Sequence, residues 1–308
     1  MSTLITGTTG FLGSHLRTAL EKDGVPVVCL IRDCPPLGVY DDASALVFGD
    51  VTDAAVCRRI LADYEVDTIY HLAAQAIVSV CGEDPVTAIK IAVMGTANIL
   101  QAVRETGRKV RVVVSISDKA YGHAPSPYTE ETPFDPRYAY EVSKACQDMV
   151  ARMFFYNFGV DVRVVRAVNI YGPGDPNESR LIPQTARRLL RGEPPLLHAG
   201  ASTMRRQFIY VDDMVRALRV IAEKGSSGEA YCVGSADPPI DVEGLMRLMA
   251  EIAGVPWAPP VVKDRDARFQ EIQSQAVIDK KLRGLGWEPE IPLAAGLRET
   301  LDWYRRGN

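Results

Sequence analysis

Two short stretches of the chain carry side chains that could transfer protons. Tyr140 and Lys144 are four residues apart, which places a phenol and an ammonium on the same face of a helix. Earlier in the chain, an apolar run ends in Ser117, Asp118 and Lys119. A nearby ammonium favours the phenolate, so Tyr140 could exchange a proton with an alcohol while a hydride leaves the same carbon. The Tyr-x-x-x-Lys spacing also occurs as a plain surface pair on amphipathic helices, so the surrounding elements are needed to decide between these interpretations.

A glycine-rich turn near the start of the chain predicts a dinucleotide site. A strand over residues 4–6 precedes the turn, a helix over residues 14–21 follows it, and a second strand over residues 25–31 completes a βαβ unit. The glycines let the backbone approach a pyrophosphate, to which the helix N-terminus adds a favourable partial charge. The cofactor-binding residues expected in this turn are Gly7, Thr9, Gly10, Phe11, Leu12 and Gly13.

The end of the second strand bears on the choice between NAD and NADP. An acidic residue there suits the ribose hydroxyls of NAD, whereas an arginine suits a 2′-phosphate. This chain has Ile31 and then Arg32, with Asp33 one residue later. Arg32 therefore favours NADP over NAD as the cofactor. In the alternative, Arg32 stacks on the adenine or lies in solvent while Asp33 binds the ribose.

Alternating strands and helices predict an α/β fold with a doubly wound parallel sheet of the Rossmann type. Further strands are expected over residues 46–51, 68–75, 110–116 and 162–168, and helices over residues 53–64 and 85–105 and from Tyr140 to about residue 158. Ligands of such sheets bind at the carboxyl ends of the strands. The residues expected to meet the cofactor there are Asp50, Val51, Leu72, Ala73 and Ala74, with Tyr140 and Lys144 from the helix. His71 lies inside its strand and is expected to be a core histidine.

Prolines and recurrent arginines indicate a second, smaller lobe after residue 172. The dinucleotide-binding domain is assigned to residues 1–170, with residues 205–224 returning to it. Residues 171–204 and 225–308 are assigned mainly to an interleaved C-terminal lobe for the substrate. Arginines of this lobe, among them Arg180, Arg206 and Arg268, could hold a diphosphate by bidentate hydrogen bonds. Each of them could equally be a solvated surface arginine.

Composition limits the classes of partner. The chain has 308 residues and a net charge of -4, which gives no electrostatic reason to expect nucleic acid or an anionic membrane as a partner. The six cysteines lack metal-ligand spacing, so free thiols are expected, and no metal site. The N-terminus lacks a basic, apolar leader pattern, and no run reaches the roughly 18 apolar residues of a membrane span. We therefore expect a soluble cytoplasmic protein.

These motifs together resemble the extended short-chain dehydrogenase/reductase family, in its NAD(P)-dependent nucleotide-sugar epimerase/dehydratase branch. The matching segments span nearly the whole chain in the family's order: Thr6-Gly7-Thr8-Thr9-Gly10-Phe11-Leu12-Gly13, His71-Leu72-Ala73-Ala74, Tyr140-x-x-x-Lys144, Asn169-Ile170-Tyr171-Gly172-Pro173-Gly174, Arg206-Gln207-Phe208, Tyr210-Val211-Asp212-Asp213 and Leu285-Gly286-Trp287-Glu288-Pro289. The resemblance implies NAD(P) in the first lobe, a nucleoside-diphosphate sugar in the second, and a homodimer formed through the helices at 85–105 and 140–158.

The resemblance also implies roles for single residues. Tyr140 becomes the proton-transfer residue, Lys144 its activator and a ribose ligand, and Ser117 the hydroxyl that binds the reacting oxygen. Asn169, Arg206 and Arg268 are expected to meet the sugar nucleotide. Three positions depart from the family pattern: Ala92 stands in place of an asparagine, Gln207 in place of an aspartate, and Ile31 in place of the aspartate of NAD-type members.

Asp118 and Lys119 suggest the reaction. Sugar 4,6-dehydratases have an acid/base pair after the serine, Ser-Asp-Lys resembles the pattern of CDP-glucose 4,6-dehydratases, and Gln75 resembles dehydratases as well. Lys119, made neutral by desolvation and by the charge of Lys144, would remove the C5 proton, and Asp118 would protonate the leaving C6 hydroxyl. Otherwise the two form a solvated pair, and the enzyme is a 4-epimerase or an NADPH-consuming 4-keto-6-deoxy-sugar reductase. A non-catalytic sensor of sugar nucleotides or NADP would have no reason to keep Ser117, Tyr140 and Lys144.

Overall fold

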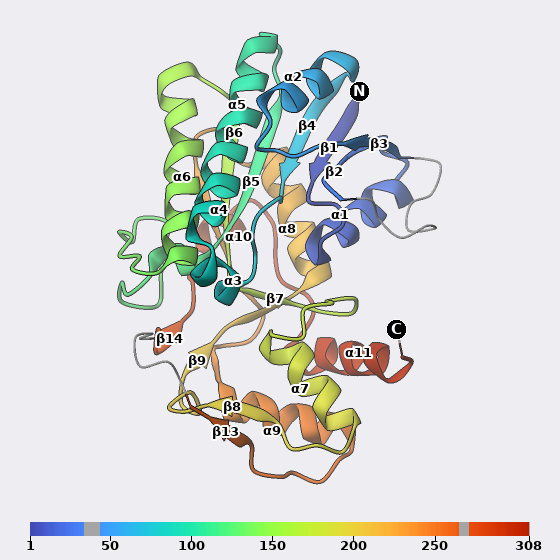
Figure 1. The fold of residues 1–308 in the computed structure, drawn as a ribbon, viewed down its shortest axis with the longest axis vertical. Coiled ribbons are helices and arrows are strands. Elements are labelled where there is room, and N and C mark those ends of the chain that lie inside the picture. Colours follow the sequence, from blue (N-terminus) through green and yellow to red (C-terminus); the bar gives the residue numbers. More distant parts are fainter. Residues whose placement is uncertain (34–43, 265–270, 308) are drawn as a thin grey trace.

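The computed structural model describes residues 1–33, 44–264 and 271–307 of the chain. Seven strands form a parallel sheet in the order β11-β6-β5-β4-β1-β2-β3 (Figure 1). The strands of this sheet are β1 Ser2–Thr6, β2 Val27–Ile31, β3 Ala45–Phe48, β4 Val66–His71, β5 Arg111–Ser117, β6 Val162–Ala167 and β11 Ala230–Val233. The chain runs outward from β1 in one direction and then from β4 in the other, so the order of the strands reverses between them. Ligands of open α/β sheets bind at such a reversal.

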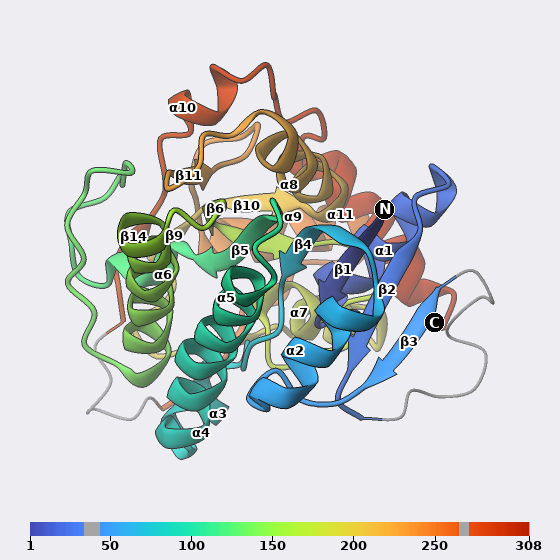
Figure 2. The ribbon, with the colours of Figure 1, turned by 90° about the horizontal axis from the view of Figure 1, so that it is seen from above.

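Helices cover both faces of the sheet (Figure 2). One layer consists of α2 Ala54–Asp63, α5 Gly95–Thr106 and α6 Ala139–Phe158, and the other of α1 Phe11–Lys22, α8 Val211–Lys224 and the short α10 Lys280–Arg283. Because both faces are covered, the central strand β5 is apolar without alternation, and Val112, Val113 and Val114 are fully buried. The predicted α/β class and doubly wound parallel sheet are confirmed.

The helix predicted over residues 85–105 is longer and less regular than an ordinary α-helix. It consists of α4 Pro85–Ile89, a π-helical segment Lys90–Met94 and α5, and the short helix α3 Val78–Glu83 precedes it. The stretch Pro85–Thr106 is apolar and long enough to cross a membrane by length and composition alone. In this fold it packs against α2 and α6, which makes it a core helix of the Rossmann layer.

The smaller lobe lies at the carboxyl ends of the sheet strands (Figure 1). Its core is shared by α7 Leu181–Leu190, α9 Val242–Ala253 and α11 Leu293–Arg305. Short strands form three small sheets separate from the main one: β7 Asn169–Tyr171 with β10 Phe208–Tyr210, β8 Leu196–His198 with β13 Val261–Lys263, and β9 Arg205–Arg206 with β12 Ile240–Asp241 and β14 Ser274–Gln275.

The returning segment follows the sequence analysis in one respect and extends it in another. Helix α8 packs on β5 and β6, as expected for residues that return to the first domain. Strand β11 also belongs to the main sheet, although residues 225–308 were assigned mainly to the smaller lobe. This strand is a fully buried run of four residues, too short to show a periodicity in the sequence.

Candidate active site

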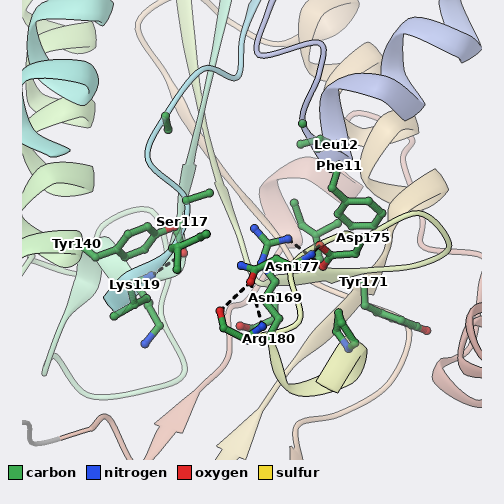
Figure 3. A pocket seen from close by; sticks show the side chains of 18 of the residues that line it. Phe11, Leu12, Ser117, Lys119, Tyr140, Asn169, Tyr171, Asp175, Asn177 and Arg180 are labelled. Carbon is green, nitrogen blue, oxygen red and sulfur yellow. Dashed lines mark hydrogen bonds and ion pairs between the residues drawn. The ribbon is translucent and has the colours of Figure 1, made fainter. Parts of the chain in front are cut away.

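A cavity of about 930 Å³ lies between the carboxyl ends of the strands and the smaller lobe, and Figure 3 shows part of its lining. Its volume is that of a site for a large ligand. The lining includes all of the expected cofactor residues, namely Gly7, Thr9, Gly10, Phe11, Leu12, Gly13, Arg32, Asp50, Val51, Leu72, Ala73, Ala74, Tyr140 and Lys144. The expected catalytic or substrate residues Ser117, Lys119, Asn169, Arg180 and Arg206 line it too.

The glycine turn has the geometry of a dinucleotide cradle. Gly7 has a φ of 78°, and a Cβ on it would lie 2.9 Å from the backbone nitrogen of Ala73. A Cβ on Gly13 would lie 2.1 Å from the carbonyl oxygen of Gly7. The N-cap of α1 is Gly10, which makes no side-chain hydrogen bond to the helix. The first turn therefore presents bare backbone N–H groups to the cavity, and these residues fit a bound pyrophosphate.

Arg32 and Asp33 line the cavity just after β2 and are paired with each other. The Arg32 Nε and an Asp33 carboxylate oxygen are 2.9 Å apart, and both side chains are mostly exposed. The preceding residue, Ile31, is buried and offers no carboxylate. To contact a ligand, Arg32 must leave this ion pair. An exposed ion pair is a weak interaction, so Arg32 can leave it at little cost.

Tyr140 and Ser117 face each other across the cavity floor (Figure 3). Burial raises the pKa of Tyr140 to about 12, and a hydrogen bond with Ser117 acts against this shift. The Lys144 Nζ lies 5.8 Å from the centre of the Tyr140 ring and donates to the Gln147 Oε1 at 3.0 Å. Burial lowers the pKa of Lys144 to about 8. The two residues lie on the same helix as predicted, and the ammonium donates a hydrogen bond to an amide oxygen.

Asp118 is buried behind Ser117 and does not line the cavity. It begins the short 3-10 helix Asp118–Tyr121, and one of its oxygens accepts a hydrogen bond from the Ser117 Oγ at 3.1 Å. The other oxygen has no hydrogen-bond partner within the described parts of the chain. Burial raises the pKa of Asp118 to about 6, and the charge of Lys119 opposes this shift. Its environment suits a carboxylic acid that gives up a proton, not the solvated pair considered in the sequence analysis.

Lys119 is in an ion pair. Its Nζ lies 2.9 Å from Oε1 of Glu271, and the Nη2 of Arg206 lies 3.3 Å from the same oxygen. This carboxylate therefore joins the expected base to an expected substrate arginine. This ion pair was not expected from the sequence. The reason is a tertiary contact, because Glu271 follows Lys119 by 152 residues.

The sugar-nucleotide end of the cavity also carries paired side chains. Arg180 donates to a carboxylate oxygen of Asp175 at 2.9 Å, and the Asn169 Nδ2 donates to the backbone carbonyl of Gln207 at 3.1 Å. Asp175 is almost fully buried, whereas the Arg180 side chain is about one-third exposed. Arg180 can therefore rotate toward a ligand while Asp175 remains in place.

Two expected substrate residues are not placed in the cavity. Gln75 does not line it, since its side-chain carbonyl accepts from the backbone nitrogen of Ile77 at 3.3 Å. Arg268 lies outside the described residues. Conversely, the sequence analysis overlooked Glu271, Asp175 and Gln147. A lone acidic or amide residue in a loop or helix carries no local pattern, so only the fold could identify them.

The comparisons agree with this geometry. The model of the NAD dependent epimerase/dehydratase family matches residues 3–234. The chain belongs to this family. It is 32% identical to the dTDP-glucose 4,6-dehydratase of Mycobacterium tuberculosis over 320 residues, which covers 99% of this chain and 93% of that protein.

Solved structures of family members share the whole fold. The UDP-glucose 4-epimerase of Thermotoga maritima, solved with UDP-glucose, has a TM-score of 0.91, 28% identity and coverage of 100% of this chain and 99% of its own. The dTDP-glucose 4,6-dehydratase DesIV of Streptomyces venezuelae, solved with NAD and dTDP, has a TM-score of 0.90, 28% identity and coverage of 99% and 97%. RMD of Pseudomonas aeruginosa, solved with NADPH, has a TM-score of 0.82, 26% identity and full coverage of both chains. These three proteins were thus solved with UDP-glucose, with NAD and dTDP, or with NADPH.

Proposed function

We propose that the chain is a nucleotide-sugar 4,6-dehydratase, which converts a nucleoside-diphosphate hexose into its 4-keto-6-deoxy derivative with loss of water. The observation that carries the proposal is the Ser117-Asp118-Lys119 sequence at the end of β5, beside Tyr140. Dehydration requires an acid and a base in addition to the proton-transfer residue at C4. Full-length similarity to dTDP-glucose 4,6-dehydratases supports the same reaction.

The first group of residues acts at C4. A nicotinamide dinucleotide held by the glycine turn would supply the hydride acceptor for oxidation at C4 and the hydride donor for reduction at C6. Tyr140 takes the proton of the C4 hydroxyl, and Ser117 donates a hydrogen bond to the same oxygen. An ammonium has three N–H donors. Because Lys144 uses one of them on Gln147, two remain for the cofactor ribose and the phenol oxygen.

The second group acts at C5 and C6. Oxidation at C4 acidifies the C5 hydrogen, so a base can remove it while an acid protonates the departing C6 hydroxyl. With a pKa of about 6, Asp118 retains a protonated fraction near neutral pH. Lys119 is assigned as the base, and its ammonium must leave the ion pair with Glu271 and give up a proton before it can accept the proton of C5.

For the cofactor we propose NADP. The support is the position of Arg32 on the cavity wall, together with the buried, apolar Ile31 at the position where NAD-type members carry a carboxylate. An arginine can pair bidentately with a 2′-phosphate. The salt bridge between Arg32 and Asp33 is exposed, so exchanging Asp33 for a phosphate costs little.

A 4-epimerase is the second candidate. The observation in its favour is that Asp118 does not line the cavity, so Ser117 and Tyr140 could act without it. An epimerase needs only oxidation and reduction at C4, and a UDP-glucose 4-epimerase is among the similar solved structures. A 4-keto-6-deoxy-sugar reductase would instead consume one NADPH for each product.

The experiment that tests the proposal is incubation of the purified protein with a panel of UDP-, dTDP-, CDP- and GDP-hexoses. We expect one substrate to lose the mass of one water and to give a 4-keto-6-deoxy sugar by NMR, without net use of cofactor. A product of unchanged mass with inverted C4 would refute the dehydratase in favour of the epimerase.

Lys119→Ala separates the two halves of the reaction. We expect the rate of water loss to fall by about 100-fold or more. Oxidation at C4 should still be detected, from the absorbance of the reduced nicotinamide that remains bound. Lys263→Ala is a matched control, because Lys263 lies on the exposed strand β13. Full dehydratase activity in Lys119→Ala would show that this lysine is not the base.

We also infer a homodimer. Helices α4 and α6 pack side by side, and large apolar side chains stay exposed on the helical layer. These are Val86, Ile89, Met94, Met149, Met153 and Tyr156. Exposed apolar groups gathered on neighbouring helices indicate a protein contact. Sedimentation should give twice the chain mass, and Val86→Glu with Met153→Glu should give monomers. A monomer of the unaltered protein at tens of micromolar would contradict this inference.

A further inference from the structure

A buried chain of hydrogen bonds runs from Lys144 into the core of the dinucleotide domain. The Lys144 Nζ donates to the Gln147 Oε1 at 3.0 Å, and the Gln147 Nε2 donates to the Thr96 Oγ1 at 3.1 Å. The His71 Nε2 lies 3.0 Å from the same threonine oxygen, and its Nδ1 lies 2.9 Å from the Thr6 Oγ1. Gln147, Thr96, His71 and Thr6 are all fully buried. The chain therefore joins the glycine turn to the lysine beside Tyr140.

The directions of these bonds are fixed by the outer partners. The backbone nitrogens of Leu72 and Ala73 donate to Thr6 Oγ1, so its hydroxyl is available to donate to His71 Nδ1. The Thr96 hydroxyl donates to the carbonyl of Ala92 at 2.7 Å, so its oxygen accepts from both His71 Nε2–H and Gln147. Burial lowers the pKa of His71 to about 3, which keeps the imidazole neutral. Each side chain of this network is thus held in one orientation by its hydrogen bonds. Because the Gln147 Nε2 donates to Thr96, its amide oxygen points toward Lys144.

Gln147 acts where the family pattern has changed. The resemblance places an asparagine at position 92, on the helix that faces α6, but this chain has Ala92. Ala92 is buried inside the π-helical segment, and its methyl group cannot make a hydrogen bond. The nearest amide that reaches Lys144 comes from α6 itself, one turn beyond the lysine.

We propose that Gln147 is a positioning residue, which orients the Lys144 ammonium and stabilises its charged form. An amide oxygen that accepts from an ammonium favours the protonated lysine. The charged form is the one that supports the Tyr140 phenolate. The inference rests on the role given to Lys144 under the proposed function.

The charged groups around Lys144 allow Gln147 to influence the pKa of the lysine. Cys81 on α3 and His71 on β4 interact electrostatically with Lys144, and Tyr140 lies one turn before it on α6. The charged residues on other elements packed against α6 include Lys90 on the π-helical segment, Lys119 on the 3-10 helix and Arg166 on β6. Arg166 is engaged with Asp148, and Lys119 with Glu271. Burial lowers the pKa of Lys144 to about 8, so a change of one hydrogen bond shifts its charge within an accessible pH range.

The test compares Gln147→Leu and Gln147→Glu, with Gln101→Leu and Gln101→Glu as matched controls on the outer side of α5, where Gln101 pairs with Glu105 at the surface. The Lys144 pKa is measured in the ligand-free protein from the ¹³Cε shift of labelled lysine, assigned with Lys144→Met. We expect the pKa to fall by about one unit in Gln147→Leu and to rise by about one unit in Gln147→Glu. The alkaline limb of the activity profile should move in the same two directions, with about fivefold lower activity of Gln147→Leu at pH 8.

The outcomes separate this inference from the proposed function. If both Gln147 variants keep the Lys144 pKa and the alkaline limb of the unaltered protein, Gln147 does not position the lysine. If the pKa moves but no nucleotide sugar is converted by the unaltered protein, the proposed function fails and the positioning role remains. Melting temperatures identify misfolding. If Gln147→Leu unfolds, the test rests on Gln147→Glu, which keeps an acceptor oxygen. An unchanged Lys144 pKa in Gln147→Glu would then be enough to overturn the inference.

Discussion

The two ends of the cavity are built from different interactions. At the dinucleotide end, the contacts come from backbone groups and from glycines that leave no room for a side chain. At the sugar-nucleotide end, the contacts come from charged side chains already paired within the protein, as in Arg180 with Asp175 and Lys119 with Glu271. The first end has its binding geometry before a ligand arrives. The second must exchange internal ion pairs for ligand contacts.

This difference predicts different responses to substitution. A backbone cradle fails when a single methyl group fills it, because neighbouring backbone cannot move away cheaply. Paired side chains can be exchanged at moderate cost, because each partner has solvent or another group available. Between the two ends lies Asp118, the proposed acid. Its carboxyl is buried, so it cannot exchange partners with solvent as the ion-paired side chains can.

Asp118→Asn should have the largest effect. We expect water elimination to fall by about 100-fold or more, because an amide cannot donate an acidic proton, while cofactor affinity and C4 oxidation are retained. In the unaltered protein, the pKa of Asp118 is raised by burial to about 6, so the protonated acid is present below that pH and is lost as the pH rises through it. The elimination step should therefore slow by about tenfold per unit well above pH 6. An elimination rate that is constant from pH 5 to pH 8 would contradict the acid role.

Gly13→Ala should come next and should act only at the dinucleotide end. The added Cβ would lie 2.1 Å from the carbonyl oxygen of Gly7, so the turn must open. We expect cofactor affinity, measured by calorimetry or fluorescence, to fall by about 100-fold. Gly82→Ala is the control, because a Cβ there meets nothing within 4 Å. Unchanged cofactor affinity in Gly13→Ala would mean that the turn does not hold the pyrophosphate.

Arg32→Ala should change cofactor preference by a smaller amount. Loss of a guanidinium that pairs with a 2′-phosphate should weaken NADP binding by about tenfold and leave NAD binding nearly unchanged. Arg59→Ala is a suitable control, because this exposed arginine lies on α2 and not on the cavity wall. An unaltered ratio of the two affinities would refute the NADP assignment.

Glu271→Gln should have the smallest effect and the opposite sign. The substitution removes the carboxylate shared by Lys119 and Arg206, so both cations become available to an anionic substrate. We expect the apparent affinity for the sugar nucleotide to rise by a few-fold, with weaker dependence on salt. Equilibrium binding of the matching nucleoside diphosphate measures this. Weaker binding would show that Glu271 itself contacts the ligand.

Sequence patterns predicted the parts of the site that are formed by residues close together along the chain. The strand, glycine turn and helix around Gly10 are contiguous, and Tyr140 and Lys144 share a helix face, so local periodicity was enough to identify them. Gln75 was placed in the substrate site only by resemblance, and its side chain instead bonds the backbone two residues later. Strand β11 was missed because four buried residues do not show a period.

The sequence by itself determined the α/β fold, the glycine turn and the placement of Tyr140 and Lys144 on one helix, because each follows from a short run of residues whose backbone geometry is set locally. Only the tertiary structure decided which side chains control the charges. Glu271 reaches Lys119 across 152 residues, and Gln147 reaches Lys144 through a network that also contains Thr96 and His71. Ion pairs and buried hydrogen bonds depend on how distant segments pack, and the spacing of residues along the chain carries no record of that packing.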